Sequence, residues 1–136
     1  MSDPAVIPIE RPRLRPIEWL ARLGAVACLI ALPILSLLPA DEIERTGAGK
    51  NVEHFIAYAG TGLLLTLGIA NPRQRVMAAL ALVLLAGTLE VAQSFTLTRS
   101  AELAQFLSST CGVGAGLVAG TIARVVLARM LVGRRH

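Results

Sequence analysis

The sequence predicts an all-α, polytopic membrane protein: a four-transmembrane-helix bundle with both termini cytoplasmic. The chain has 136 residues, of which 54% are hydrophobic and only 16% are charged. A water-soluble domain carries about a quarter charged residues, and a disordered chain is poor in apolar residues, so both classes are excluded. Four apolar stretches approach the roughly 20 residues that a helix needs to cross a bilayer. This length allows one domain.

The four helices are expected at about 19–39, 53–71, 75–95 and 103–127. In the first, the charge-free stretch contains Pro33, which membrane helices tolerate when neighbours satisfy the freed carbonyl. Within the second, no Asp, Glu, Lys or Arg occurs from His54 to Pro72, and only Glu90 interrupts the third. The fourth is the most uniformly apolar. Each stretch is therefore expected to span the membrane.

These helices form one membrane domain at 19–131, between a flexible cytosolic N-terminal tail at 1–18 and a basic C-terminal tail at 132–136. The connections are short and contain breakers such as Asn71-Pro72, so successive helices are expected to run antiparallel. Cys28 and Cys111 lie within apolar stretches without a Cys or His at metal-ligand spacing. We interpret them as small buried apolar residues, and we expect neither a metal ion nor a cofactor.

The basic residues predict the orientation. If the N-terminus is cytoplasmic, that side holds ten of the thirteen, namely Arg11, Arg13, Arg15, Arg22, Arg73, Arg75, Arg124, Arg129, Arg134 and Arg135. The opposite side holds three, namely Arg45, Lys50 and Arg99. Cytoplasmic loops carry an excess of Lys and Arg, so both termini are expected inside. The sequence pI near 10.0 then reflects orientation in a lipid bilayer and not a nucleic-acid partner.

In this topology, the polar residues that are costly to place in the hydrocarbon core lie near the outer leaflet. The candidate ligand-binding residues come from the second, third and fourth helices and the outer loop: His54, Tyr58, Glu90, Gln93, Arg99 and Gln105. A carboxylate within a span costs a few kcal/mol, so Glu90 should face the bundle, with His54, Tyr58 and Arg99 as its natural partners. Two compatible interpretations follow, a polar clamp between helices and a functional site.

Glycines repeat at every fourth position of the last helix, at Gly112, Gly116 and Gly120. Small residues at this spacing let two helices approach closely. We prefer packing within one chain, and a homodimer through the glycine repeat is the alternative.

The ordered set of polar residues resembles the signature of VanZ-like membrane proteins. The stretch from Lys50 to Tyr58 is similar to that family's D-K-x-x-H-F-x-x-Y. Glu90, Gln93, Arg99 and Gly112 are similar to its E-x-x-Q, then R, then D-x-x-x-N-x-x-G; here Gln105 takes the Asp position and Ser109 the Asn position. The resemblance implies a bacterial plasma (inner) membrane protein of the cell envelope, in a family associated with antibiotic resistance to glycopeptides, particularly teicoplanin.

Three functions remain open. The leading hypothesis is a binding protein whose outer cluster takes a lipid-linked envelope precursor or a glycopeptide. The second is an intramembrane enzyme acting on a lipid-linked substrate, in which Glu90 or His54 is the general acid or base and Arg99 holds a phosphate. It ranks lower, because the chain lacks the acidic residue of the family pattern at Gln105. The third is an accessory membrane subunit.

Overall fold

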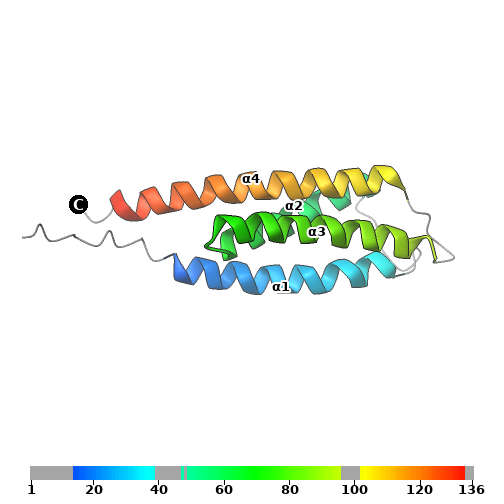
Figure 1. The fold of residues 1–136 in the computed structure, drawn as a ribbon, viewed down its shortest axis with the longest axis horizontal. Helices are drawn as coiled ribbons and strands as arrows, with labels where there is room; N and C mark the ends of the chain where they lie inside the picture. The colour runs from blue at the N-terminus through cyan, green and yellow to red at the C-terminus, as the bar shows by residue number, and fades with distance from the viewer. Residues whose placement is uncertain (1–13, 39–46, 48, 96–101, 134–136) are drawn as a thin grey trace, which may run out of the picture.

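The chain forms long helices wherever its structure is described. A computed structural model describes residues 14–38, 47, 49–95 and 102–133. In these ranges lie four helices, α1 (Arg15–Leu37), α2 (Lys50–Gly68), α3 (Pro72–Gln93) and α4 (Leu103–Gly133), and no strand (Figure 1). The all-α prediction is confirmed. Among the described residues α1, α3 and α4 are long and apolar enough to cross a membrane.

The helix ends differ from the predicted ranges for local reasons. α1 begins at Arg15 rather than at 19, because Pro16 fits the first helical turn, where its missing N–H is not needed. α3 begins at Pro72, where the Asn71 side chain accepts a hydrogen bond of 2.9 Å from the Arg73 N–H. α4 continues to Gly133 instead of ending at 127. Both predicted tails are therefore partly helical, and residues 1–13 and 134–136 lie outside the described part.

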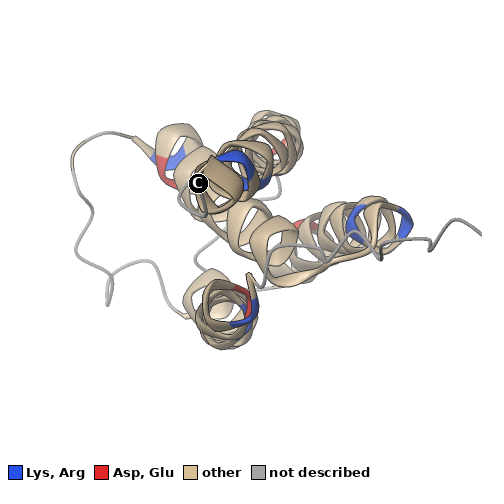
Figure 2. Ribbon diagram, turned by 90° about the vertical axis from the view of Figure 1, so that its left-hand side faces the viewer, with Lys and Arg blue, Asp and Glu red and all other residues tan. Residues whose placement is uncertain are grey.

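α2 is the central helix of the bundle. Figure 1 shows α1 and α4 on opposite sides, with α2 and α3 between them. α2 packs most extensively against α4 and next against α1, whereas α1 and α4 have no close backbone contact among the described residues. Figure 2, which looks along the bundle, shows few charged positions on the helices. α2 therefore contacts each of the other three helices, while Val52, Phe55 and Ile56 remain exposed.

The glycine repeat of α4 lies against α2. A Cβ atom on Gly112 would sit 2.4 Å from the Phe55 carbonyl oxygen, and one on Gly116 would sit 2.3 Å from the Ala59 carbonyl oxygen. Gly114, between them, has open space around it. Only glycine permits this approach, so the repeat packs within the chain. A homodimer through the glycine repeat stays a prediction. Because the repeat contacts α2 in this structure, a dimer that keeps this contact would need another surface.

The distribution of side chains reverses that of a water-soluble protein. The buried polar residues are Thr61, Thr66, Glu90, Gln93, Gln105 and Ser109. Large apolar side chains are exposed instead, including Leu84 at 72% and Phe95 at 84%. Exposed apolar surface of this extent marks contact with a membrane or a partner, and small or polar residues are typical of helix contacts in lipid. The fold therefore supports the membrane class that the composition predicts.

The cysteines do not both lie in the interior, contrary to the prediction. Both are free thiols; Cys28 is half-buried and Cys111 is exposed on α4. The inward face of α4 is occupied by the glycines that contact α2, so Cys111, which precedes Gly112, faces away from it.

Candidate functional site

Five of the six predicted site residues lie at one end of the bundle. At this end α1 and α3 finish and α2 and α4 begin, and we name it the His54 end (Figure 1). Arg99 lies outside the described residues. His54 is half-buried, whereas the other four, Tyr58, Glu90, Gln93 and Gln105, are buried. The antiparallel arrangement therefore gathers residues that are up to 51 positions apart in the chain, from His54 to Gln105.

His54 joins α2 to α4 through a short hydrogen-bond chain. The Ser109 hydroxyl donates its one proton to the Gln105 carbonyl oxygen at 2.9 Å. The His54 Nδ1 atom lies 3.3 Å from the same Ser109 oxygen. With that hydroxyl proton directed to Gln105, the Ser109 oxygen can accept a hydrogen bond from the His54 tautomer that is protonated at Nδ1. The imidazole orientation is thus fixed from α4.

Two buried polar groups beside the His54–Ser109 hydrogen bond, the Tyr58 hydroxyl and the Gln105 side-chain amide, have spare hydrogen-bonding capacity. The Tyr58 ring stacks on His54, with centroids 6.4 Å apart and an interplanar angle of 11°. Tyr58 is 3% exposed and Gln105 is 2% exposed. Within the described part of the chain, neither the Tyr58 hydroxyl nor the Gln105 side-chain amide has a hydrogen-bond partner. Buried groups of this kind bind ordered water or a ligand, because leaving them unpaired is costly.

Glu90 caps the start of α4. One oxygen of its carboxylate accepts a hydrogen bond from the backbone N–H of Glu102, the residue before the helix. A negative charge is stabilised at a helix N-terminus, where the first N–H groups have no partner within the helix. The sequence predicts side-chain partners for Glu90 but not this backbone donor, because a backbone N–H is present at almost every residue and leaves no mark in the sequence.

An open cavity lies at the rim of the His54 end. It has a volume of about 430 Å³ and is lined by Gly49, Lys50, Asn51, Val52 and Glu102. Lys50 and Glu102 form an ion pair across it, with 3.4 Å between Nζ and Oε1. Both side chains keep more than a third of their surface exposed, at 35% and 42%. Because both side chains are exposed, their charges are accessible to a polar ligand. Exposed pairs of this kind contribute little to stability.

Gln93 serves as a clamp between helices. Its side-chain nitrogen donates to the Ser36 carbonyl oxygen at 3.0 Å and lies 2.6 Å from the Ser36 hydroxyl. This ties the end of α3 to the end of α1. The predicted cluster therefore divides into a clamp at Gln93, a helix cap at Glu90 and a group around His54, Tyr58 and Gln105 with capacity for a ligand.

A second polar cluster, which sequence analysis did not identify, surrounds the C-terminus of α2 at the opposite end. Arginines from three helices donate to carbonyl groups at its end and just after it: Arg22 to Gly68, Arg124 to Leu67, and Arg75 to Ile69 and Ala70. Arg124 also forms an ion pair of 2.7 Å with Glu18. We name this the Arg124 end. Cations are stabilised at a helix C-terminus, where the last carbonyls lack partners within the helix.

Among the described residues, no group of three or more His, Cys, Asp or Glu is placed to hold a metal ion. Comparison of the chain with protein-family models, curated proteins and solved structures found no match.

Proposed function

We propose that the chain is a bacterial plasma-membrane protein in which all four helices cross the bilayer. Both termini lie in the cytoplasm, and the His54 end lies on the outer side. The excess of arginine at the other end supports this orientation, since cytoplasmic segments are rich in Lys and Arg.

α2 is included as a span because its polar residues beyond the first turn are buried or half-buried in the bundle. Its 19 residues give a length of about 29 Å, close to the thickness of the hydrocarbon core. Tyr58, Thr61 and Thr66 are buried, and the two threonine hydroxyls donate to the carbonyls of Ala57 and Gly62 in the same helix. α2 is less apolar than the other three helices. It can still cross the bilayer, because these three polar side chains are turned away from the lipid.

We further propose that the protein binds an envelope component at the His54 end, a lipid-linked precursor or a glycopeptide such as teicoplanin, as the resemblance to VanZ-like proteins implies. The observation that carries this proposal is the pair of buried groups with spare capacity, the Tyr58 hydroxyl and the Gln105 amide. Gln105 lies one turn into α4 from Glu102, which lines the open cavity. Rim charges and buried amide and hydroxyl groups together suit a ligand rich in polar groups.

Tolerance of a susceptible host to teicoplanin tests this function. Expression of the chain should raise the tolerated concentration. Gln105→Leu and Tyr58→Phe should abolish the increase, because each removes polar atoms while roughly keeping side-chain volume. Gln74→Leu, at an exposed position near the opposite end, is the matched control and should keep it.

Binding to the purified protein in lipid nanodiscs tests the same site directly. The probes are labelled teicoplanin and a lipid-linked cell-wall precursor. We expect one of them to bind, and we expect Gln105→Leu to weaken that binding by about tenfold, as for the loss of one well-placed hydrogen bond. Absence of binding by both probes, or equal affinities for Gln105→Leu and Gln74→Leu, would refute the proposal.

A further inference from the structure

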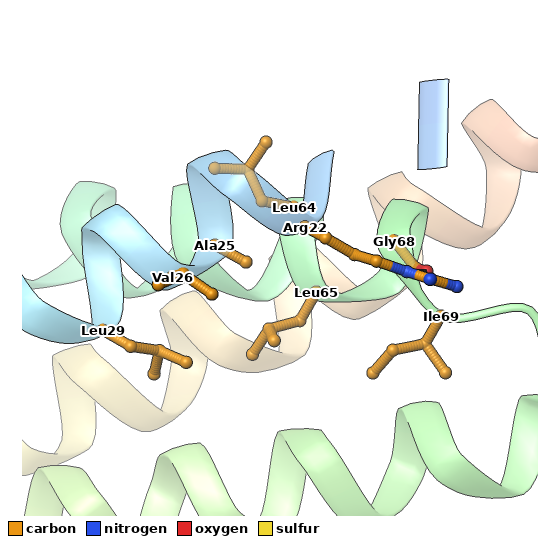
Figure 3. A pocket seen from close by; sticks show the side chains of 8 residues that line it. All are labelled: Arg22, Ala25, Val26, Leu29, Leu64, Leu65, Gly68 and Ile69. Carbon is orange, nitrogen blue, oxygen red and sulfur yellow. Dashed lines mark hydrogen bonds between the residues drawn. The ribbon is translucent and has the colours of Figure 1, made fainter. Parts of the chain in front are cut away.

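A narrow groove opens between α1 and α2 near the Arg124 end (Figure 3). Its volume is about 120 Å³. Apart from Arg22, its lining is apolar and comes from α1, α2 and the residue after α2: Ala25, Val26, Leu29, Leu64, Leu65, Gly68 and Ile69. An apolar lining offers water no hydrogen-bond partner and is suited to contact with hydrocarbon.

Arg22 closes one end of the groove, and only one of its three guanidinium nitrogens donates a hydrogen bond within the described ranges. Figure 3 shows its side chain extending toward Gly68. Its Nε atom donates to the Gly68 carbonyl oxygen at 2.7 Å, which fixes the position of the guanidinium. The side chain is exposed, and its two terminal nitrogens have no partner within the described ranges. Arg22 therefore offers two N–H-bearing nitrogens on the side away from Gly68.

The surroundings of Arg22 favour an anion. Arg75 and Arg124 bind neighbouring carbonyls of the same helix end and add positive charge, while Glu18 is paired with Arg124. A guanidinium binds a phosphate through parallel charge-assisted hydrogen bonds. Basic sites between helices at this depth are suited to anionic lipid headgroups.

We propose that this groove binds one anionic phospholipid, with an acyl chain along Val26, Leu29 and Leu65 and the phosphate on the terminal nitrogens of Arg22. A groove of this volume accepts part of one hydrocarbon chain and not a protein helix. The site is separate from the His54 end and requires only that the bundle lies in a bilayer. Its failure would leave the proposed envelope ligand untouched.

Native mass spectrometry of the full-length protein released from detergent tests this site. The protein is titrated with phosphatidylglycerol or phosphatidylcholine of identical acyl chains. We expect a single phosphatidylglycerol to be retained about tenfold more strongly than phosphatidylcholine, because the choline cation of the latter offsets its phosphate charge and is repelled by Arg22, Arg75 and Arg124. Soluble glycerol phosphate should not compete, because it has the anion without the acyl chain.

Two pairs of variants separate the headgroup contact from the groove. Arg22→Gln should remove the preference for phosphatidylglycerol, whereas Arg15→Gln, which removes an equal charge from an exposed position on the same helix, should keep it. Val26→Trp should block the groove and weaken both lipids. Ile30→Trp, one turn along α1 and equally exposed at 57% against 54%, should weaken neither.

Three results would overturn the proposal: equal retention of the two lipids by the wild type, an unchanged preference in Arg22→Gln, or competition by glycerol phosphate. A Val26→Trp protein that keeps its helical content and retains lipid like Ile30→Trp would refute the groove as the acyl-chain site.

Discussion

Gly116 lies directly against the backbone of α2, so Gly116→Ala should destabilise the bundle. In Gly116→Ala the new Cβ would lie 2.3 Å from the Ala59 carbonyl oxygen and 2.7 Å from the Leu63 nitrogen. Both neighbours are backbone atoms, so neither can rotate away as a side chain would. An ordinary contact begins at 3.4 Å, and α2 and α4 must therefore separate by about 1 Å.

The expected cost follows from two opposing effects. Overpacking costs about 1–3 kcal/mol, and a rigid backbone neighbour places Gly116→Ala near the upper value. Alanine gains at most about 1 kcal/mol over glycine within a helix. The net loss is about 2 kcal/mol. Gly114→Ala is the matched control, because it has the same gain and no atom within 4 Å to clash with. The two variants should differ by about 3 kcal/mol.

Energy transfer between α1 and α4 measures this difference. The chain has one tryptophan, Trp19 on α1, and the variant Cys28→Ala leaves the exposed Cys111 on α4 as the single site for an acceptor dye. Titration with SDS in mixed micelles then reports when the helices separate. Gly116→Ala should lose energy transfer at a lower SDS fraction than Gly114→Ala. Coincident transitions would contradict the close packing of α2 on α4.

Three further predictions use the same unfolding assay. Glu90→Gln should lower the free energy of unfolding by about 1 kcal/mol, because it removes the charge at the N-terminus of α4; no change would mean that the cap is not charge-dependent. Lys50→Met should cost less than about 1 kcal/mol, since its pair with Glu102 is exposed, and a larger loss would contradict that view. Arg124→Met should cost about 3 kcal/mol, because it leaves Glu18 unpaired, and a second change, Glu18→Gln, should recover part of the loss. Additive effects of those two changes would argue against a coupled pair.

The helices were predictable because their apolar composition and the helix-breaking residues between them are visible in the sequence. Charge-free stretches located the helices, and Asn71-Pro72 marked the boundary between the second and third. The sequence becomes less apolar after residue 123, so the fourth helix was predicted to end at 127. The structure continues α4 to Gly133, because the helix accommodates Arg124 and Arg129. One pairs with Glu18 and the other is exposed.

The grouping of His54, Tyr58 and Gln105 was predictable from their positions at adjoining helix ends. The partners of Glu90 and Gln93 were not predictable, because a backbone group supplies one and a different helix supplies the other. Glu90 binds a backbone N–H, and Gln93 binds Ser36 of α1, a helix to which sequence analysis assigned no site residue. From the sequence, Arg22, Arg75 and Arg124 were predicted only to set the orientation in the membrane.

The arginine cluster had a signal that was available in the sequence. A helix that ends just before Asn71-Pro72 leaves its last carbonyls without partners, and Arg75 follows within one turn. Glu18 is an acidic residue between Arg15 and Arg22, which points to an ion pair. Its partner Arg124 is 106 positions away, however, and only the fold brings the two together.

The central claim is that α2 crosses the bilayer, so that the His54 end faces outward and the Arg124 end faces the cytoplasm. Single cysteines at Asn51 and Gln74, both exposed and near opposite ends of the bundle, test it in a chain lacking Cys28 and Cys111. A membrane-impermeant maleimide applied to intact cells should label Asn51→Cys, whereas Gln74→Cys should react only after the membrane is opened. Labelling of both positions in intact cells, protection of both, or the reverse pattern would contradict the claim.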